Sequence, residues 1–180
     1  MRKLLFSLAC LLALTGCRPV QYTHNIPDLY QVDPTVWRSG QPIDDADWQY
    51  MHDKLGITHV VKLNFESEGT DDGAKRAGMM VHVLSIQPEG DKSLFDNITN
   101  TFVQPDRANI VEALKVIDSG ETVLVHCTHG HDRTGLVIGI HRVENDGWRK
   151  DAAYKEMLDY GFHPELHGLH EFWETFHVSL

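Results

Sequence analysis

The sequence is poor in cysteine and has no long apolar run. Three of its 180 residues are cysteine, and no two of them form a Cys-x-x-Cys pair, so the common cysteine-pair zinc sites are excluded. The most apolar stretch lies between residues 4 and 14 and is too short to cross a bilayer as a stable helix. Each cysteine therefore needs its own explanation.

Basic residues are also scarce. Sixteen Lys and Arg residues stand against 26 Asp and Glu residues, which gives a formal net charge of -10. A surface this acidic repels other polyanions, so nucleic acid is not expected as a partner. The chain has no internal repeat or low-complexity tract, and its length and apolar content are typical of a single domain with one core. We expect it to be a monomer.

The first seventeen residues have the pattern of an export signal. Arg2 and Lys3 precede the apolar stretch, and Leu-Thr-Gly-Cys closes it at Cys17; this is typical of a secretory segment and resembles the lipobox of bacterial lipoproteins. The resemblance implies cleavage before Cys17 and lipidation of that cysteine. The protein would then be tethered to a bacterial membrane, facing the periplasm or the exterior. An ordinary signal with soluble release is the alternative.

The chain is therefore predicted to have three parts: a signal peptide at 1–16, a lipidated tether at 17–33 without amphipathic periodicity, and a folded domain at 34–180. The cysteine inside the signal would be lost and Cys17 would carry lipid. Cys127 would then be the one free thiol. In an oxidising compartment an unpaired cysteine is a liability, which is tolerable if the thiol itself is used.

The spacing of apolar residues predicts alternating strands and helices. Helices are expected at 45–54, 70–77, 105–120, 134–145, 151–160 and 165–176. Strands are expected at 58–64, 79–86 and 122–126. The alternation predicts an α/β fold whose central, mostly parallel twisted sheet has about four to five strands flanked by helices.

The most informative segment is HCTHGHDRTG at residues 126–135. A buried strand is predicted before it and a core helix after it, so the segment follows the carboxyl end of a parallel strand, where α/β proteins bind ligands. Several backbone N–H groups and the positive end of the helix dipole then face one small bowl. Such a loop can hold a phosphate.

The residue types in this loop suit phosphoryl transfer. Cys127 lies where a thiol ionises readily, and the thiolate is the nucleophilic form of cysteine. Arg133 can bind two phosphoryl oxygens through its planar fork. Gly130 permits the positive φ that brings the amides together. Thr134 can donate a hydrogen bond to the thiolate, while His126 is expected to orient the loop.

The segment resembles the active-site loop of the cysteine-dependent protein tyrosine phosphatase superfamily, in the form found in its compact, dual-specificity-like bacterial branch. The segments 36–42, 60–64 and 152–162 are similar to other parts of those proteins, so the likeness spans roughly residue 34 to the end. It implies a dual-specificity phosphatase-like fold, with Asp132 fixing the loop or contacting the substrate. The implied phosphate-binding loop comprises Thr128, His129, Gly130, His131 and Asp132.

A metal site is the competing interpretation, because three histidines and a cysteine crowd into residues 126–131. No His-x3-His pair occurs in that loop, and a bound metal would leave Arg133 without a purpose. We therefore expect no metal and no other cofactor.

The family mechanism implies a general acid, usually an aspartate on a loop between the preceding strand and helix. Here the loop at 87–104 offers Glu89, Asp91 and Asp96. Asp91 is the first choice because it follows the strand closely and lies beside Gly90, which could act as a hinge; Asp96 is the second. The Trp-Pro-Asp triplet of the classical tyrosine phosphatases is missing, so the identity of the acid is open.

These residues predict a phosphomonoester hydrolase that works through a phosphocysteine at Cys127. A broad substrate range including inositol polyphosphates, as in the tyrosine phosphatase-like phytases, is preferred because His129 and His131 could charge in mildly acidic surroundings and attract further phosphates. Phosphoproteins, dephosphorylated by a protein tyrosine or dual-specificity phosphatase, are the alternative. The expected partner is thus a phosphorylated small molecule or a phosphoprotein.

Two other functions are less favoured. The loop is also similar to that of the RNA triphosphatases of capping enzymes, but an exported, acidic chain makes RNA a poor substrate. A degenerate phosphatase fold that only binds a phosphorylated ligand is the non-enzymatic alternative. The intact Cys127 and Arg133 argue against it.

Overall fold

The computed structural model describes residues 25–88 and 107–177. A sheet with the strand order β1-β2-β5-β3-β4 lies at its centre. The strands are β1 (Tyr30–Gln31), β2 (Val36–Ser39), β3 (His59–Lys62), β4 (Met80–Val83) and β5 (Val123–His126). β1 runs antiparallel to β2, and the other neighbouring pairs are parallel. The predicted α/β fold with a mostly parallel sheet is confirmed.

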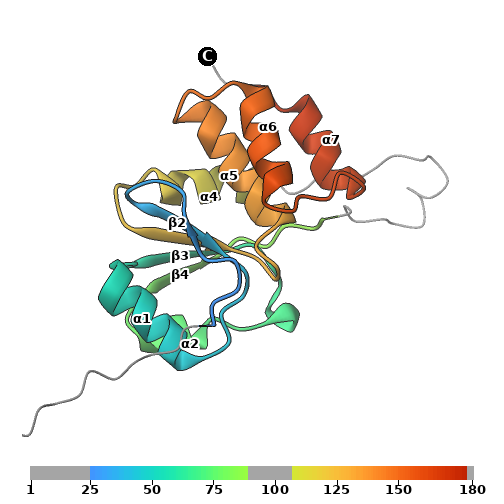
Figure 1. Cartoon of the computed structure of the whole chain (residues 1–180). Helices are drawn as coiled ribbons and strands as arrows, with labels where there is room; N and C mark the ends of the chain where they lie inside the picture. The colour runs from blue at the N-terminus through green and yellow to red at the C-terminus, as the bar shows by residue number, and fades with distance from the viewer. Residues whose placement is uncertain (1–24, 89–106, 178–180) are drawn as a thin grey trace, which may run out of the picture.

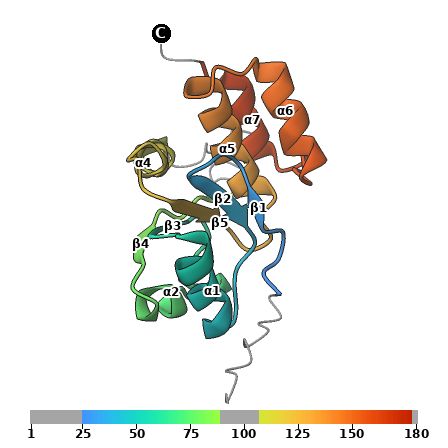
Figure 2. The same ribbon diagram turned by 60° about the vertical axis from the view of Figure 1, so that its left-hand side comes forward.

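Helices cover both faces of this sheet. One face carries α1 (Asp45–Leu55) and α2 (Asp72–Arg76), and the other carries α4 (Arg107–Ile117), α5 (Asp132–Glu144), α6 (Lys150–Asp159) and α7 (His167–Thr175), as Figures 1 and 2 show. A short 3-10 helix, η1 (Glu66–Glu68), joins β3 to α2. Within the described residues, no helix is long and apolar enough to span a membrane.

β5 divides the core because its side chains alternate between the two faces. Val123 and Val125 pack on the side of α4, α5, α6 and α7, while Leu124 packs on the side of α1. All three are fully buried, and burying a side chain of this size contributes about 1.5–3 kcal/mol. The strand that leads into the predicted phosphate loop is therefore fixed from both sides.

α1 shows how the sequence specifies a helix that holds the sheet. Asp44 precedes it with extended backbone, and Gly56 ends it in the left-handed conformation at φ 71°, which glycine adopts without strain. Trp48 and Met51 lie one turn apart and are buried against the sheet. The bounds agree with the prediction for residues 45–54.

The pattern of apolar residues did not predict the two N-terminal strands. β1 lies inside the segment 17–33 that is predicted to be a tether, and β2 lies in the segment matched only by resemblance. Of that tether, residues 25–33 are described, and they pack on the domain: the carbonyl of Pro27 accepts a hydrogen bond from Gly40 N at 2.8 Å. The folded unit therefore begins before residue 34. Cys17 and the predicted signal lie outside the described residues.

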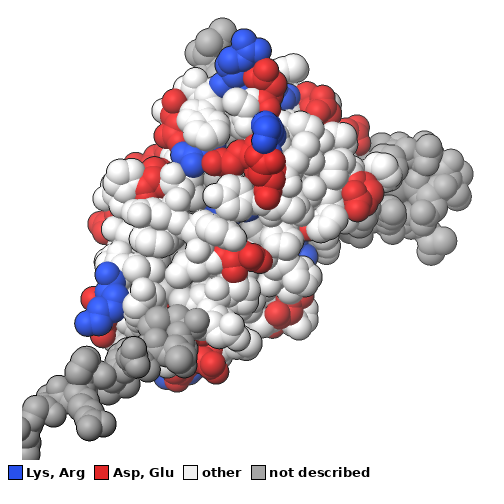
Figure 3. Space-filling view, viewed as in Figure 1, with Lys and Arg blue, Asp and Glu red and all other residues white. Residues whose placement is uncertain are grey.

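On the face viewed in Figure 3, Lys and Arg lie beside Asp and Glu at the upper end and at the lower left, whereas further acidic side chains lie without basic neighbours near the middle and on the right. Two exposed ion pairs illustrate this: Lys155 contacts Asp159 at 2.6 Å on α6, and Arg149, just before α6, contacts Asp151 at 2.9 Å. Their positive charges are locally balanced. Exposed pairs of this kind contribute only about 0–1 kcal/mol each.

Candidate active site

The segment between β5 and α5 forms a tight loop around a single thiol. Cys127 directly follows β5, is 4% exposed and is a free cysteine. Gly130 has φ 78°, and a Cβ added there would lie 2.7 Å from the backbone carbon of Ser39, so only glycine can occupy this position. The loop leads directly into α5, whose first residue is Asp132.

The neighbouring strand β2 supports the loop from behind. Arg38 is 2% exposed and donates from Nη2 to the carbonyl of Gly130 at 2.7 Å. Its guanidinium also lies 4.3 Å from the ring centroid of Tyr160, which is a favourable cation–π distance. Burial lowers the pKa of Arg38, although nearby Glu156 and Tyr160 oppose this. Gln41 N donates to the carbonyl of Thr128 at 3.1 Å.

A pocket of about 190 Å³ opens over this loop. It receives side chains from the loop itself, from η1, from the end of the described segment after β4, and from the residue before α7. Its lining comprises Glu68, Pro88, Cys127, Thr128, His129, Asp132, Arg133 and Leu166. The sequence predicts that Cys127 and Arg133 belong to one phosphate-binding loop, and in the structure both line this pocket.

Glu68 holds the fork of Arg133. The Arg133 Nη1 and Nη2 atoms donate to Glu68 Oε2 and Oε1 at 3.0 and 2.9 Å, and Thr128 Oγ1 donates to Glu68 Oε1 at 2.8 Å. Both ions are shielded, since their side chains are 11% and 29% exposed. A bidentate pair of this kind fixes the plane of the guanidinium.

The pKa of Glu68 is lowered to about 2. Burial alone would raise it, but the hydrogen bonds from Arg133, from Phe65 N and from Thr128 outweigh the burial. Glu68 is therefore ionised at all ordinary pH values, and in this arrangement it has no proton to give to a leaving group.

A buried polar network lies beneath the loop and η1. His126 Nε2 lies 2.8 Å from Asp71 Oδ2, and both side chains are fully buried. Asp71 Oδ1 accepts from Gln41 Nε2 at 2.9 Å. Lys62 Nζ donates to the carbonyl of Gly69 at 2.7 Å and lies 3.8 Å from Asp71 Oδ1. The network thus connects the histidine before Cys127 to the residue that follows Glu68.

Asp71 carries the negative charge of this network. Burial alone would raise its pKa, but the hydrogen bond from His126, followed by the charge of His126, the hydrogen bond from Gln41 and the charge of Lys62, lowers it. Asn64 Nδ2 completes the cluster by donating to Gln41 Oε1 at 2.9 Å. Mutual hydrogen bonds fix the group, although Asn64 Oδ1 and His126 Nδ1 have no hydrogen-bond partner among the described residues.

His129 lines the pocket, and two further histidines lie beside it and form with it what we call the rim histidines. The ring of His131 lies 6.4 Å from that of His129 and 6.4 Å from that of His163. Asp132 accepts from both the backbone N–H and the ring of His163, at 2.8 and 3.0 Å, and this contact raises the pKa of His163. His131 Nε2 lies 3.1 Å from Asp28 Oδ2. Asp132 thus ties the loop to the segment that leads into α7.

The remaining predicted residues fall into two groups. The hydroxyl of Thr134 is buried and has no hydrogen-bond partner among the described residues, so it is available to a thiolate or a ligand. Asp91 and Asp96, the two choices for the general acid, lie outside the described residues. Pro88, three positions before Asp91, lines the pocket.

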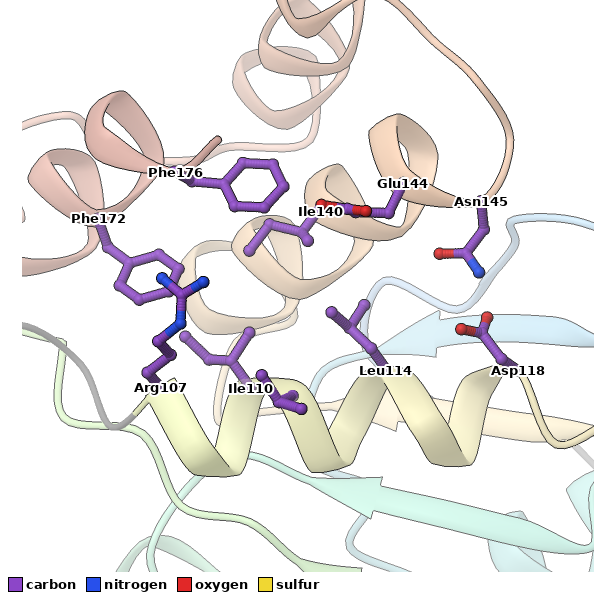
Figure 4. Close-up of a pocket in the computed structure, with 10 residues that line it drawn as sticks. Arg107, Ile110, Leu114, Asp118, Ile140, Glu144, Asn145, Phe172 and Phe176 are labelled. Atoms are coloured by element: carbon purple, nitrogen blue, oxygen red, sulfur yellow. The ribbon is translucent and has the colours of Figure 1, made fainter. Parts of the chain in front are cut away.

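A larger pocket of about 250 Å³ lies elsewhere, between α4, α5 and α7. Figure 4 shows its apolar side chains, among them Ile110, Leu114, Ile140, Phe172 and Phe176, facing one another across the space between these helices. Its lining contains neither cysteine nor histidine. Its chemistry differs from that of the loop pocket, which alone of the two combines a nucleophile with an anion-binding group.

Sequence reasoning missed Glu68 and Asp71. Both lie in the polar stretch after β3, where many carboxylates occur in a few residues and none stands out by periodicity. Only the parallel order of the strands brings this stretch beside the loop, since β3 neighbours β5. The one available signal was that it follows the carboxyl end of a strand, as the phosphate loop does.

The comparison with known proteins matches the part of the chain that contains the phosphate loop. The profile of the tyrosine phosphatase family matches residues 32–141. The dual specificity protein phosphatase TpbA of Pseudomonas aeruginosa is 31% identical over 141 residues, which cover 77% of this chain and 56% of TpbA. The chain thus spans a little over half the length of this curated relative.

Solved structures show the same fold. A crystal structure of a P. aeruginosa TpbA variant in complex with pTyr has a TM-score of 0.61 at 25% identity, covering 82% of this chain and 83% of the other. The core catalytic domain of the PP-IP phosphatase Siw14 from S. cerevisiae has a TM-score of 0.63 at 19% identity, covering 83% and 85%. The family profile includes the loop around Cys127 and Arg133 and extends over more than half of the sequence, and the chain therefore belongs to the tyrosine phosphatase family.

Proposed function

We propose that this protein is a cysteine-dependent phosphomonoester hydrolase. The observation that carries the proposal is the meeting of Cys127 and Arg133 in one pocket, at the end of β5 and the start of α5. A helix N-terminus with converging amides binds an anion. A shielded thiol next to that site is suited to attack it.

The reaction would take two steps. The Cys127 thiolate attacks phosphorus, the S–P bond forms, and the P–O ester bond breaks as the leaving oxygen takes a proton from a carboxylic acid. A water molecule then attacks phosphorus, the S–P bond breaks, and the carboxylate recovers its proton from that water. Arg133 and the loop amides stabilise the equatorial oxygens in both steps.

Each loop residue receives a role in this scheme. Thr134 donates its free hydroxyl to the sulfur as it leaves phosphorus. His126 holds the start of the loop through Asp71. The backbone from Thr128 to Asp132 binds the phosphate. Glu68 keeps the Arg133 fork in one plane so that its remaining N–H groups face the phosphate.

Asp91 remains the proposed general acid, with Asp96 as the second choice. The pocket supports this choice indirectly, because its two described carboxylates are engaged: Glu68 with Arg133, and Asp132 with His163. Pro88, three residues before Asp91 in the sequence, lines the pocket. An Asp91→Asn variant that keeps full activity at neutral pH would exclude it.

The proposed substrates are phosphomonoesters of broad range, including inositol polyphosphates. The rim histidines support this range because imidazoles that charge near pH 6 can attract a second phosphate. His163 is the best placed to be charged, since Asp132 raises its pKa. In this proposal the protein is exported and anchored at Cys17 to a bacterial membrane, facing the periplasm or the exterior.

A protein tyrosine or dual-specificity phosphatase is the second candidate. It is favoured by the relatives: TpbA is named a dual specificity protein phosphatase, and its structure was solved with pTyr. The carboxylates at the rim also favour it, because Asp28 and Asp132 partly neutralise the histidines that would bind further phosphates.

The test is a substrate panel at pH 5, 6 and 7.5. We expect the purified protein to hydrolyse an aryl phosphate, vanadate to inhibit it, and Cys127→Ser to lower kcat by at least about 10⁴-fold while still binding a phosphate analogue. Inositol hexakisphosphate should be hydrolysed best at pH 5, because the raised pKa of His163 beside Asp132 favours its charged form there.

Two outcomes would count against these proposals. Strong turnover of phosphotyrosine peptides without any turnover of inositol phosphates would select the second candidate. Hydrolysis that persists fully in Cys127→Ser would refute cysteine catalysis, and binding without turnover in the unmodified protein would indicate a ligand-binding module.

A further inference from the structure

A cluster of one histidine and three aspartates lies far from the thiol, at the opposite end of α5. His141 is 5% exposed, and its Nε2 atom lies 3.2 Å from Asp33 Oδ2 and 3.9 Å from Asp146 Oδ1. These three ligand-type atoms all lie within 4.8 Å of one another. His141 Nδ1 faces Asp118 Oδ1 at 3.5 Å on the other side of the ring.

Two of the three carboxylates are each held through one oxygen and offer the other. Asp33 Oδ1 accepts from the backbone N–H groups of Thr35 and Val36, both at 2.8 Å, which leaves Oδ2 toward His141. Asp146 Oδ2 accepts from Arg142 Nη1 at 2.8 Å, which leaves Oδ1 toward the same point. The ligand atoms are therefore oriented before any ion arrives.

Asp118 has the place of a supporting carboxylate. A metal-binding histidine usually presents its second ring nitrogen to a carboxylate or carbonyl, which fixes the tautomer and the ring orientation. His141 Nδ1 is buried, has no hydrogen-bond partner within the described residues, and lies nearest to Asp118. Figure 4 shows Asp118 at the end of α4, pointing toward the end of α5, where Asn145 lies.

The negative charges around His141 favour the binding of a cation. Asp33, Asp118 and Asp146 lie around the ring. Arg142 is shared between Asp146 and Glu156, which it contacts at 2.8 and 3.0 Å. A divalent cation bound by the imidazole and two carboxylates would offset that charge.

We propose that Asp33, His141 and Asp146 bind a divalent cation of the zinc type. Zinc takes nitrogen and oxygen ligands at about 2.0–2.2 Å in a tetrahedron, so its ligand atoms lie about 3.3–3.5 Å apart. The separations of 3.2 and 3.9 Å from Nε2 are close to that spacing. Asp146 is exposed, which leaves one side of the site open to an arriving ion and to a water as fourth ligand.

The bound ion would have a structural role. It would tie the turn between β1 and β2, which carries Asp33, to the C-terminal end of α5, which carries His141. The sequence led to the expectation of no metal and no other cofactor, argued from the loop around Cys127, and this proposal departs from that expectation. The present site lies at the other end of the same helix and takes no part in the proposed hydrolysis.

The test is zinc binding by the full chain in which Cys127→Ser has removed a competing thiol. Calorimetry should give one Zn²⁺ per chain with a Kd tighter than about 1 µM. Asp146→Asn and His141→Asn should each weaken binding at least about tenfold. Asp151→Asn, which changes an exposed aspartate on α6, is the matched control and should keep the affinity.

Asp146→Asn is the decisive variant, because Asp146 is exposed and its loss leaves the core intact, whereas His141→Asn could disturb folding. Zn²⁺ should also raise the thermal midpoint of the Cys127→Ser protein but not that of the same protein carrying Asp146→Asn. Absence of micromolar binding, or binding that Asp146→Asn leaves unchanged, would overturn the proposal. A loss of equal size in His131→Gln would move the site to the rim of the active-site pocket and also refute it.

Discussion

At its N-terminal end α5 receives the loop with Cys127 and Arg133, whereas at its C-terminal end it presents His141 to three aspartates. The helix dipole favours anions at the first end and cations at the second. The side chains follow the same division. The loop pocket pairs its one carboxylate from η1 with Arg133, while the other end collects more carboxylates than cations.

The two ends also differ in how they can be read from the sequence. The loop is one continuous segment, and the spacing of Cys127 and Arg133 within it predicts phosphate chemistry. The cluster at the other end is assembled from the β1–β2 turn, the residue after α4 and the end of α5. A pattern in the sequence can therefore predict the first site but not the second. Variants that change one end of α5 and leave the other intact therefore test both the proposed active site and the proposed zinc site.

The largest effect is expected at the N-terminal end. Arg133→Lys keeps the charge but loses the bidentate fork, so kcat for an aryl phosphate should fall by about 10²–10³-fold. Steady-state kinetics measures the loss. Arg149→Lys, in which an exposed arginine just before α6 is changed, is the control and should behave as the unmodified protein. Zinc affinity should stay the same in both variants, and a loss of zinc in Arg133→Lys would mean that the two ends are coupled.

The second effect concerns the buried support of the loop. Asp71→Asn removes the negative charge between His126 and Lys62, so the buried Lys62 ammonium keeps its hydrogen bond to Gly69 but loses the carboxylate 3.8 Å away. Breaking such a pair typically costs about 3 kcal/mol or more. Urea unfolding should show this loss, while Asp72→Asn, one residue away and exposed, should stay near the unmodified value. Equal stability of the two variants would exclude a structural role for the network.

A smaller effect is expected from Glu68. Glu68→Gln keeps the shape of the side chain but frees the Arg133 fork, so kcat/KM should fall by about tenfold, equivalent to about 1.4 kcal/mol. Exposed Glu66→Gln is the matched control. Unchanged kinetics in Glu68→Gln would show that the loop alone positions Arg133.

The same variant has a pH signature. The folded-state pKa of Glu68 is lowered to about 2, so its pairing stabilises the protein fully above the ordinary glutamate pKa. That contribution is lost as the pH falls from about 4.5 toward 2. The difference in unfolding free energy between the unmodified protein and Glu68→Gln should therefore shrink over that range. A difference that grows with acidity would contradict the assignment.

Much of the fold could be predicted from the sequence, and the failures have a common cause. α1, α5 and α7 carry apolar residues at helical spacing, and the expected segments match their bounds within a few residues. β1 has two exposed residues and no apolar period. It exists because β2 offers an open edge, which is a property of the assembled sheet.

The sequence predicted only the part of the candidate site whose residues are close together in the chain. The loop from His126 to Thr134 is local, and the parallel sheet places it at a ligand-binding edge. Glu68, Asp71 and the zinc ligands come from segments far apart in the chain, so neither spacing nor composition links them to a partner. The predicted acids Asp91 and Asp96 stay predictions, because both lie outside the described residues.

The sequence by itself determined the α/β alternation, the family and the loop that unites Cys127 with Arg133, because each depends on short-range spacing. Only the tertiary structure decided which carboxylate holds Arg133, what lies beneath His126, and what surrounds His141. Those contacts are made when β3 and the β1–β2 turn join the sheet around β5 and α5. They arise from strand order, which fixes neighbours that the linear sequence leaves tens of residues apart.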